Sequence, residues 1–457
     1  MAIRTAPIRL RWDTQQFLKI LLALCITGWA LLLVVAHSTG SVTTPRAAIL
    51  LAFPIVALGV ALRPAWVVLL LVSVPLTQIE AVPTRSQVEA VPTRGLVLLL
   101  VVTLGAQLVM QGRLSVGWRS GFIGLALLLV ASSLLRIELP LGEALVARGI
   151  LNDLAFYLLL GLVTYNATRA GALQADHFVN AILLGITLGV AVDMVFQSGA
   201  AGSEITPVGR PVAYLASAGF SICFARLISR KPDGSIYHPI LHAILGCGFL
   251  VVMIPGLLRG AWLSALISVL LVSSWSSRKR YWVLIGLALV AILSVPVARE
   301  RVIPTDEPGS GGGFTTGRLE LWTRLWDEIA PGMPWGNGFG HSVTLDSEEL
   351  FGAGSTDFVK VEERNTFVYP HNDFIFWMVE LGVIGLFGML LFWAQLIRAS
   401  RRALRSTSRD HVILVGGVLV AGFISQLVGT TFFFRPLATP FFAVAGFVFA
   451  LRPSSTT

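Results

Sequence analysis

The sequence carries little charge: only 13% of its 457 residues are Asp, Glu, Lys or Arg, whereas 55% are hydrophobic. Soluble domains contain roughly 25% charged residues, so this composition excludes a soluble protein and indicates a chain that crosses a membrane many times. The net charge of +9 is spread over connections between hydrophobic segments. Because there is no soluble basic domain, nucleic-acid binding is not expected.

Cysteine is also scarce, and the usual cofactor motifs are missing. Cys25, Cys223 and Cys247 all fall in hydrophobic segments without metal-ligand spacing, so we expect core residues rather than disulfides or ligands. The sequence has no HExxH zinc motif, no Walker phosphate loop and no GxSxG nucleophile motif. The sequence therefore predicts neither a metal nor another cofactor.

Long hydrophobic runs dominate the sequence. A helix needs about 20 mainly apolar residues to cross a bilayer. Candidate spans lie near 17–36, 46–62, 65–77, 95–111, 121–135, 150–165, 178–197, 211–228, 239–255, 258–274, 281–298, 373–397, 411–432 and 436–451. The segment 65–77 is short enough to be re-entrant. We therefore predict an all-α membrane protein with about 12–14 spanning helices.

The basic residues predict the orientation of these spans. Lys and Arg are dense before the first span and in the connections 229–234, 276–281 and 398–410. Because basic loops stay on the cytoplasmic side, both termini are expected there and the long loop 299–372 on the opposite side. The predicted organisation is a multi-span region (1–298), this outer loop (299–372) and C-terminal helices (373–457).

The outer loop contains two distinct patterns. Apolar residues recur at helical spacing and predict an amphipathic helix over about 317–330: Leu319, Trp322, Leu325, Trp326 and Ile329. Pro331 ends this pattern. The following GMPWGNGFG (332–340) is rich in glycine, which favours turns with positive φ or close backbone approach.

Arginines recur at the predicted outer ends of helices. Arg210, Arg259 and Arg318 each stand at such a position, and Arg435 begins the last span. Arginine is costly at bilayer depth, and a single one is explained by reaching to the lipid headgroups. Several on one side favour an anion site, because the guanidinium binds phosphate bidentately and keeps its charge.

His371 stands in YPHNDF, where the chain re-enters the bilayer. A lone interfacial histidine is commonly a polar residue at headgroup level. Its proton exchanges near neutral pH, however, which suits a general base. Asn372 or Asp373 could orient the imidazole. With the outer arginines, these residues indicate chemistry on a lipid-linked anion at the membrane surface.

Four segments resemble signature regions of the O-antigen ligase and polymerase superfamily: LRGAWLS (258–264), TGRLELW (316–322), PWGNGFG (334–340) and HNDFIFWMVELGVIGL (371–386). The resemblance implies a GT-C-like glycosyltransferase of the bacterial inner membrane that takes a glycan from undecaprenyl diphosphate at the periplasmic face. It implies functional positions at Arg259, Arg318 and His371, with Arg210 a weaker match. A ligase transfers the glycan to lipid A–core, whereas a polymerase extends another lipid-linked unit.

The expected reaction is a metal-independent, inverting transfer. Arginines would neutralise charge that builds on the leaving diphosphate, and His371 would take the proton of the attacking hydroxyl. A polymerase of the same superfamily would use the same chemistry. A lipid-linked glycan transporter is the remaining alternative, but it predicts internal repeats and ionisable residues at mid-span, for which Asp193 is the candidate.

Overall fold

The computed structural model describes residues 122–135, 137–138, 141–169, 171, 173–200, 210–228, 239–256, 259–275, 322–323, 325–327, 332–344, 372–405, 411, 413–428 and 435–451. All of them belong to one compact unit of the chain. The predicted spans near 17–36, 46–62, 65–77, 95–111 and 281–298 lie outside the described residues.

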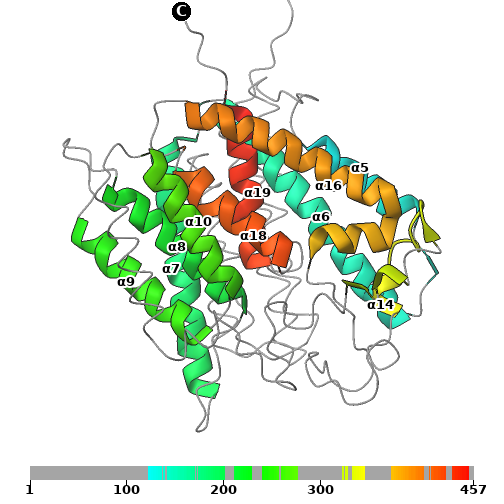
Figure 1. Ribbon diagram of the computed structural model, residues 1–457, viewed down its shortest axis with the longest axis horizontal. Helices are drawn as coiled ribbons and strands as arrows, with labels where there is room; N and C mark the ends of the chain where they lie inside the picture. The colour runs from blue at the N-terminus through cyan, green and yellow to red at the C-terminus, as the bar shows by residue number, and fades with distance from the viewer. Residues whose placement is uncertain are drawn as a thin grey trace, which may run out of the picture. The chain divides into compact units, whose positions relative to one another are not determined.

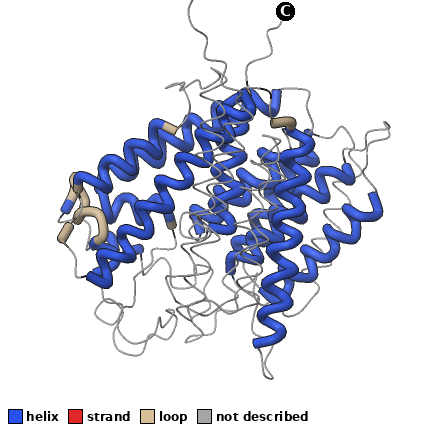
Figure 2. Tube along the Cα trace, turned by 180° about the vertical axis from the view of Figure 1, so that it is seen from behind, coloured by secondary structure: helices blue, strands red, loops and turns tan. Residues whose placement is uncertain are grey.

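The described residues are almost entirely helical (Figures 1 and 2). The helices are α5 (Ile123–Leu134), α6 (Leu141–Arg169), α7 (Ala175–Ala200), α8 (Arg210–Ile228), α9 (Pro239–Gly256), α10 (Arg259–Trp275), α14 (His341–Thr344), α16 (Asp373–Arg405), the π-helical η2 (Leu414–Leu419), α18 (Val420–Val428) and α19 (Arg435–Ala450). No strand occurs among them, only an isolated bridge residue, Phe339. The predicted all-α class is confirmed for this part of the chain.

Two helices in the described part have the length and composition to cross a membrane. They are Ala147–Arg169 and Asp373–Arg405, and shorter apolar helices accompany them. The total of about 12–14 spans stays a prediction. The amphipathic helix over 317–330 also stays a prediction. Of its residues, 322–323 and 325–327 are described, and these are helical.

Small residues allow the helices to pack closely. Gly219 of α8 lies against Phe249 of α9, and further along the same pair Gly246 lies against Cys223, so α8 and α9 run antiparallel. Only residues 257 and 258 separate α9 from α10. So short a connection turns α10 back, parallel to α8.

Polar side chains join the parallel helices α8 and α10 inside the bundle. The hydroxyls of Ser217 and Ser264 form a hydrogen bond with 3.3 Å between the oxygens, and both residues are fully buried. Ser217 lies in the first half of α8 and Ser264 in the first half of the parallel α10, so the two helices begin at the same end of the bundle.

Helix α16 is broken near its start. Gly382 has φ 59° and ψ −139°, which are not helical values, and separates a first half-helix (373–381) from the long remainder. In Figure 1 this first half-helix turns away from the rest of α16 and runs back toward α18. Because the helix is broken, its first residues return to the bundle.

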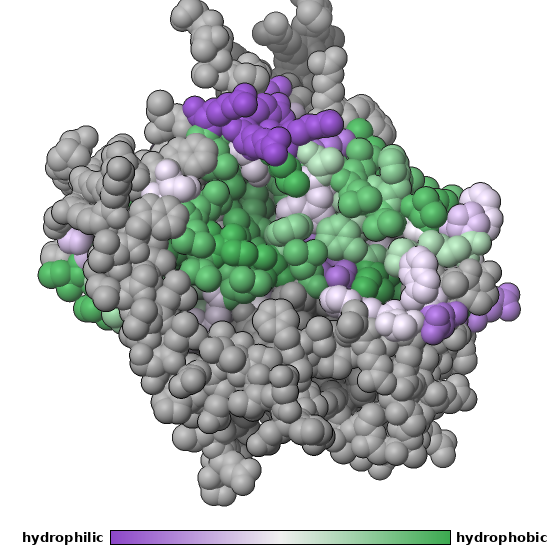
Figure 3. Space-filling view, viewed as in Figure 1, coloured by the Kyte–Doolittle hydropathy of each residue, from purple (hydrophilic) through white to green (hydrophobic). Residues whose placement is uncertain are grey.

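One end of α16 is basic. Arg401, Arg402 and Arg405 are exposed near its last turn. Figure 3, in the same view as Figure 1, shows hydrophilic residues at the top of the molecule and a broad hydrophobic surface below them. The cytoplasmic position of segment 398–410 stays a prediction.

Candidate functional site

The predicted site residues differ in how far the structure describes them. Arg318 and His371 lie outside the described residues. Arg210 and Arg259 are the first residues of α8 and α10, and their backbones are described. Asn372 and Asp373 are described with their side chains.

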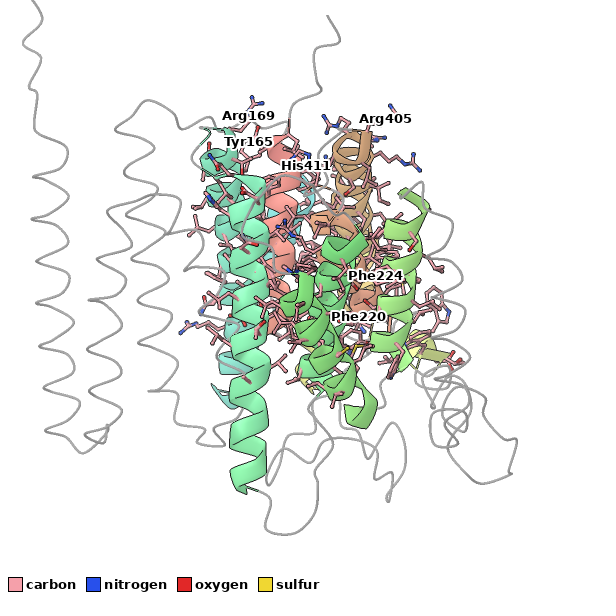
Figure 4. The ribbon with its side chains drawn as sticks, turned by 90° about the vertical axis from the view of Figure 1, so that its left-hand side faces the viewer. Tyr165, Arg169, Phe220, Phe224, Arg405 and His411 are labelled. Atoms are coloured by element: carbon pink, nitrogen blue, oxygen red, sulfur yellow. The ribbon has the colours of Figure 1, made fainter. Side chains whose placement is uncertain are left out.

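The starts of these helices share one end of the bundle. Figure 4 shows Arg169, Arg405 and His411 at one end, and Phe224 nearer to that end than Phe220. Helix α8 therefore runs toward the end that holds Arg405, and it starts at the opposite end. Helix α10 is parallel to α8, so both of the arginines that begin these helices lie at this opposite end.

Asn372 fixes the start of α16 against α18. Its Oδ1 accepts hydrogen bonds from the backbone N–H groups of Phe374 (2.9 Å) and Ile375 (3.1 Å), which makes it the N-cap of the helix. Its Nδ2 donates to the carbonyl of Leu427 in α18 at 3.1 Å. Asp373 follows, fully buried in the first turn of α16, where a carboxylate is favoured by the helix dipole. The residue after His371 is thus held firmly against α18.

A second assembly surrounds the break in α16. We call residues Gly332–Ser342 the glycine loop. Its backbone bonds to both sides of the break: Asn337 N–H donates to Val379 O at 3.1 Å, Gly338 N–H to Glu380 O at 3.0 Å, and Val383 N–H to Pro334 O at 2.8 Å. A broken helix leaves backbone groups without helical partners, and here the loop supplies them.

The carboxylate of Glu380 is the polar centre of this assembly. Glu380 is fully buried, and it accepts hydrogen bonds from the N–H of Gly340, the hydroxyl of Ser342 and, at 2.9 Å, the N–H of Ser342. A buried carboxylate is stable only when donors surround it. All three donors come from the end of the glycine loop.

A backbone hydrogen bond and apolar contacts hold the rest of the glycine loop in place. Phe339 N–H donates to Leu135 O at 2.8 Å, next to the end of α5, and the Phe339 ring stacks on Trp377 with centroids 6.2 Å apart. Both rings are fully buried. Leu325 packs on Val379, so the short helical stretch 325–327 contacts the same half-helix.

This arrangement limits what the glycine loop can do chemically. The N–H groups of Asn337, Gly338, Gly340 and Ser342 all donate to α16, so they do not form a cradle for phosphate. The loop is thus a packing element, and anion binding by Arg210, Arg259 and Arg318 stays a prediction. Among the described side chains no group of His, Cys, Asp or Glu could hold a metal ion, and metal independence stays a prediction.

Sequence reasoning did not single out Glu380. The available signal was an acidic residue inside an apolar run, FIFWMVELGVIGL, since ionisable residues in membrane helices have specific partners or functions. Only the fold shows that its partners lie about forty residues earlier in the chain.

Comparison with known proteins bears on the same region. Residues 243–390 match the family model described as O-antigen ligase. This span includes α10, the glycine loop and the broken start of α16. No match was found among curated proteins. The match covers less than half of the chain, and it supports the resemblance of the sequence to the O-antigen ligase superfamily.

Proposed function

We propose that this protein is an O-antigen ligase that transfers a glycan from undecaprenyl diphosphate to lipid A–core at the periplasmic face of the inner membrane. One observation carries the proposal: α8 and α10 begin at the same end of the bundle, opposite the end that holds Arg405. The first residues of α8 and α10 are Arg210 and Arg259, and His371 comes two residues before α16. The family match over 243–390 supports it.

The arginines bind the diphosphate. Arg210 and Arg259 add their charges to the partial positive charge of two helix N-termini, and Arg318 adds a third guanidinium from the outer loop. The charge of the leaving diphosphate grows as the sugar departs, so preorganised donors stabilise the transition state most. The bundle thus needs neither metal nor ATP for this step.

His371 is the general base. It takes the proton from the acceptor hydroxyl as that oxygen forms a bond to the anomeric carbon and the bond to the diphosphate breaks. One displacement inverts the anomeric carbon. Because Asn372 is occupied in capping α16, its contribution is to fix the position of the neighbouring His371. Asp373, in the first turn of the same helix, orients the imidazole in this proposal.

The test is transfer by the purified protein in lipid nanodiscs. The donor is an undecaprenyl-diphosphate glycan, offered with lipid A–core or alone. Glycan on lipid A–core supports the ligase, whereas longer lipid-linked glycan from donor alone identifies a polymerase. No transfer in either reaction refutes both. His341→Ala is a suitable control for His371→Ala, since His341 belongs to the glycine loop and should have a much milder effect.

A further inference from the structure

We propose that Glu380 is a positioning residue: its carboxylate locks the glycine loop into the break of α16 and so holds two segments of the proposed active site together. The consequence for transfer rests on the proposed function. The lock itself does not, because it follows from contacts among described residues.

The lock is mutual. Glu380 is fully buried in an apolar helix, and its carboxylate takes its three donors from Gly340 and Ser342 rather than from α16. Without the loop the carboxylate would lose these donors, and without the carboxylate the buried donors of the loop would lose their acceptor. Both losses are costly, so the loop and the half-helix are stable only together.

Close packing fixes the register of the lock. Gly336 and Gly382 face each other, both with positive φ (77° and 59°). A Cβ on Gly336 would lie 2.8 Å from the carbonyl carbon of Leu381 and 2.9 Å from Glu380 O, and still closer to the backbone nitrogen of Gly382. Backbone therefore meets backbone, and the loop cannot slide along α16 without a clash.

The lock joins two parts of the proposed site. Trp322 and Leu325 pack on Val379 of the first half-helix, and Arg318 precedes Trp322 by four residues in the sequence. His371 directly precedes Asn372, which caps the same half-helix. When the glycine loop is bound in the break, the segment after Arg318 and the segment after His371 therefore both pack on the first half-helix of α16. Glu380 itself has no free face for substrate, so its role is positioning and not catalysis.

Hydrogen exchange of the full chain in nanodiscs tests the lock directly. In Glu380→Gln, an amide nitrogen replaces one of the two acceptor oxygens. This nitrogen cannot accept a hydrogen bond from the donors of Gly340 or Ser342. We expect peptides over 332–342 to exchange about 10-fold faster or more, with a larger change in Glu380→Ala. Ser342→Ala, which removes one hydroxyl donor, should have a smaller effect. Peptides from α8 should be unchanged, and Glu138→Gln, at an exposed position near the loop, should match the wild type.

Single-turnover transfer tests the positioning role. A shift of about 1 Å in a reacting group can cost roughly 100-fold in rate, so the rate should fall about 10- to 100-fold in Glu380→Gln and further in Glu380→Ala. A merely structural role would lower the yield of folded protein but not its rate per folded molecule.

Three results would overturn parts of this inference. Wild-type exchange in the Glu380→Gln loop shows that the carboxylate does not hold the loop. Fast exchange with a wild-type transfer rate shows that the lock exists but does not position the site. If the wild-type protein transfers no glycan, the proposed function fails, and the exchange measurement still decides whether the lock exists.

Discussion

Replacing Gly382 by alanine should separate the glycine loop from α16. The φ and ψ of Gly382, 59° and −139°, belong to a region that side chains other than hydrogen rarely enter. A Cβ would also lie 2.5 Å from the carbonyl carbon of Trp335, and closer still to Pro334 O and Gly336 N. All three neighbours are backbone atoms, so none can rotate away.

The size of the effect follows from these two terms. Adopting the glycine conformation costs an alanine about 1–3 kcal/mol. Restoring ordinary van der Waals distances moves the loop by about an ångström, and each backbone hydrogen bond lost then costs about 1 kcal/mol. Val383 N–H to Pro334 O and Asn337 N–H to Val379 O are the bonds most directly affected. We expect a destabilisation of about 2–5 kcal/mol.

The matched control is Gly248→Ala. Gly248 lies within α9, and an added Cβ there meets nothing within 4 Å. Alanine in such a helical position is neutral or stabilising by about 0.5–1 kcal/mol. Thermal unfolding of both variants in detergent, followed by size-exclusion chromatography, measures the difference. If Gly382→Ala proves as stable as Gly248→Ala, the close backbone packing at the break is wrong.

Four further predictions follow from the same structure and sequence. A reporter at Gly312 should read periplasmic, and a cytoplasmic signal would overturn both topology and site. Transfer should survive EDTA and need no ATP; loss restored by a divalent ion contradicts the arginine-only account. His371→Ala should lower the single-turnover rate about 10²- to 10⁴-fold with nearly unchanged donor affinity, and a normal rate would remove His371 from the mechanism. Arg259→Lys and Arg318→Lys should weaken donor binding. Asn372→Ala should cost about 0.5–2 kcal/mol in thermal unfolding, because α16 loses its N-cap.

Hydrophobic length predicted most of the described helices to within a few residues, because burying or embedding an apolar helix requires a run of that length. Helix α6 shows where this signal ends: the apolar run near 150–165 predicts its centre, but the helix extends from Leu141 to Arg169. Its first turns carry Glu143 and Arg148, which hydropathy does not count although they do not break a helix. Polar helix ends are therefore missed.

The break in α16 shows a different limit. Hydropathy predicts one span over 373–397, and a glycine inside an apolar run is common in membrane helices. Whether Gly382 is helical or not depends on what packs against it, here the backbone of Pro334 and Gly336. The glycine-rich sequence predicted a loop with positive φ or close approach, but its partner is set by a contact between segments far apart in the chain.

This contact changes how the outer loop and the membrane helices relate to each other. A broken helix leaves backbone groups that need partners from elsewhere in the protein. The glycine loop provides these partners, and Glu380 in return needs the loop's donors. The glycine loop and the first half of α16 therefore fold as one structure. The boundary predicted at residue 372, between the outer loop and the C-terminal helices, does not separate them. The proposed site takes Arg318 from one segment and His371 from the other. It requires such a connection, because independent motion of the two segments would separate the proposed phosphate-binding group from the proposed base.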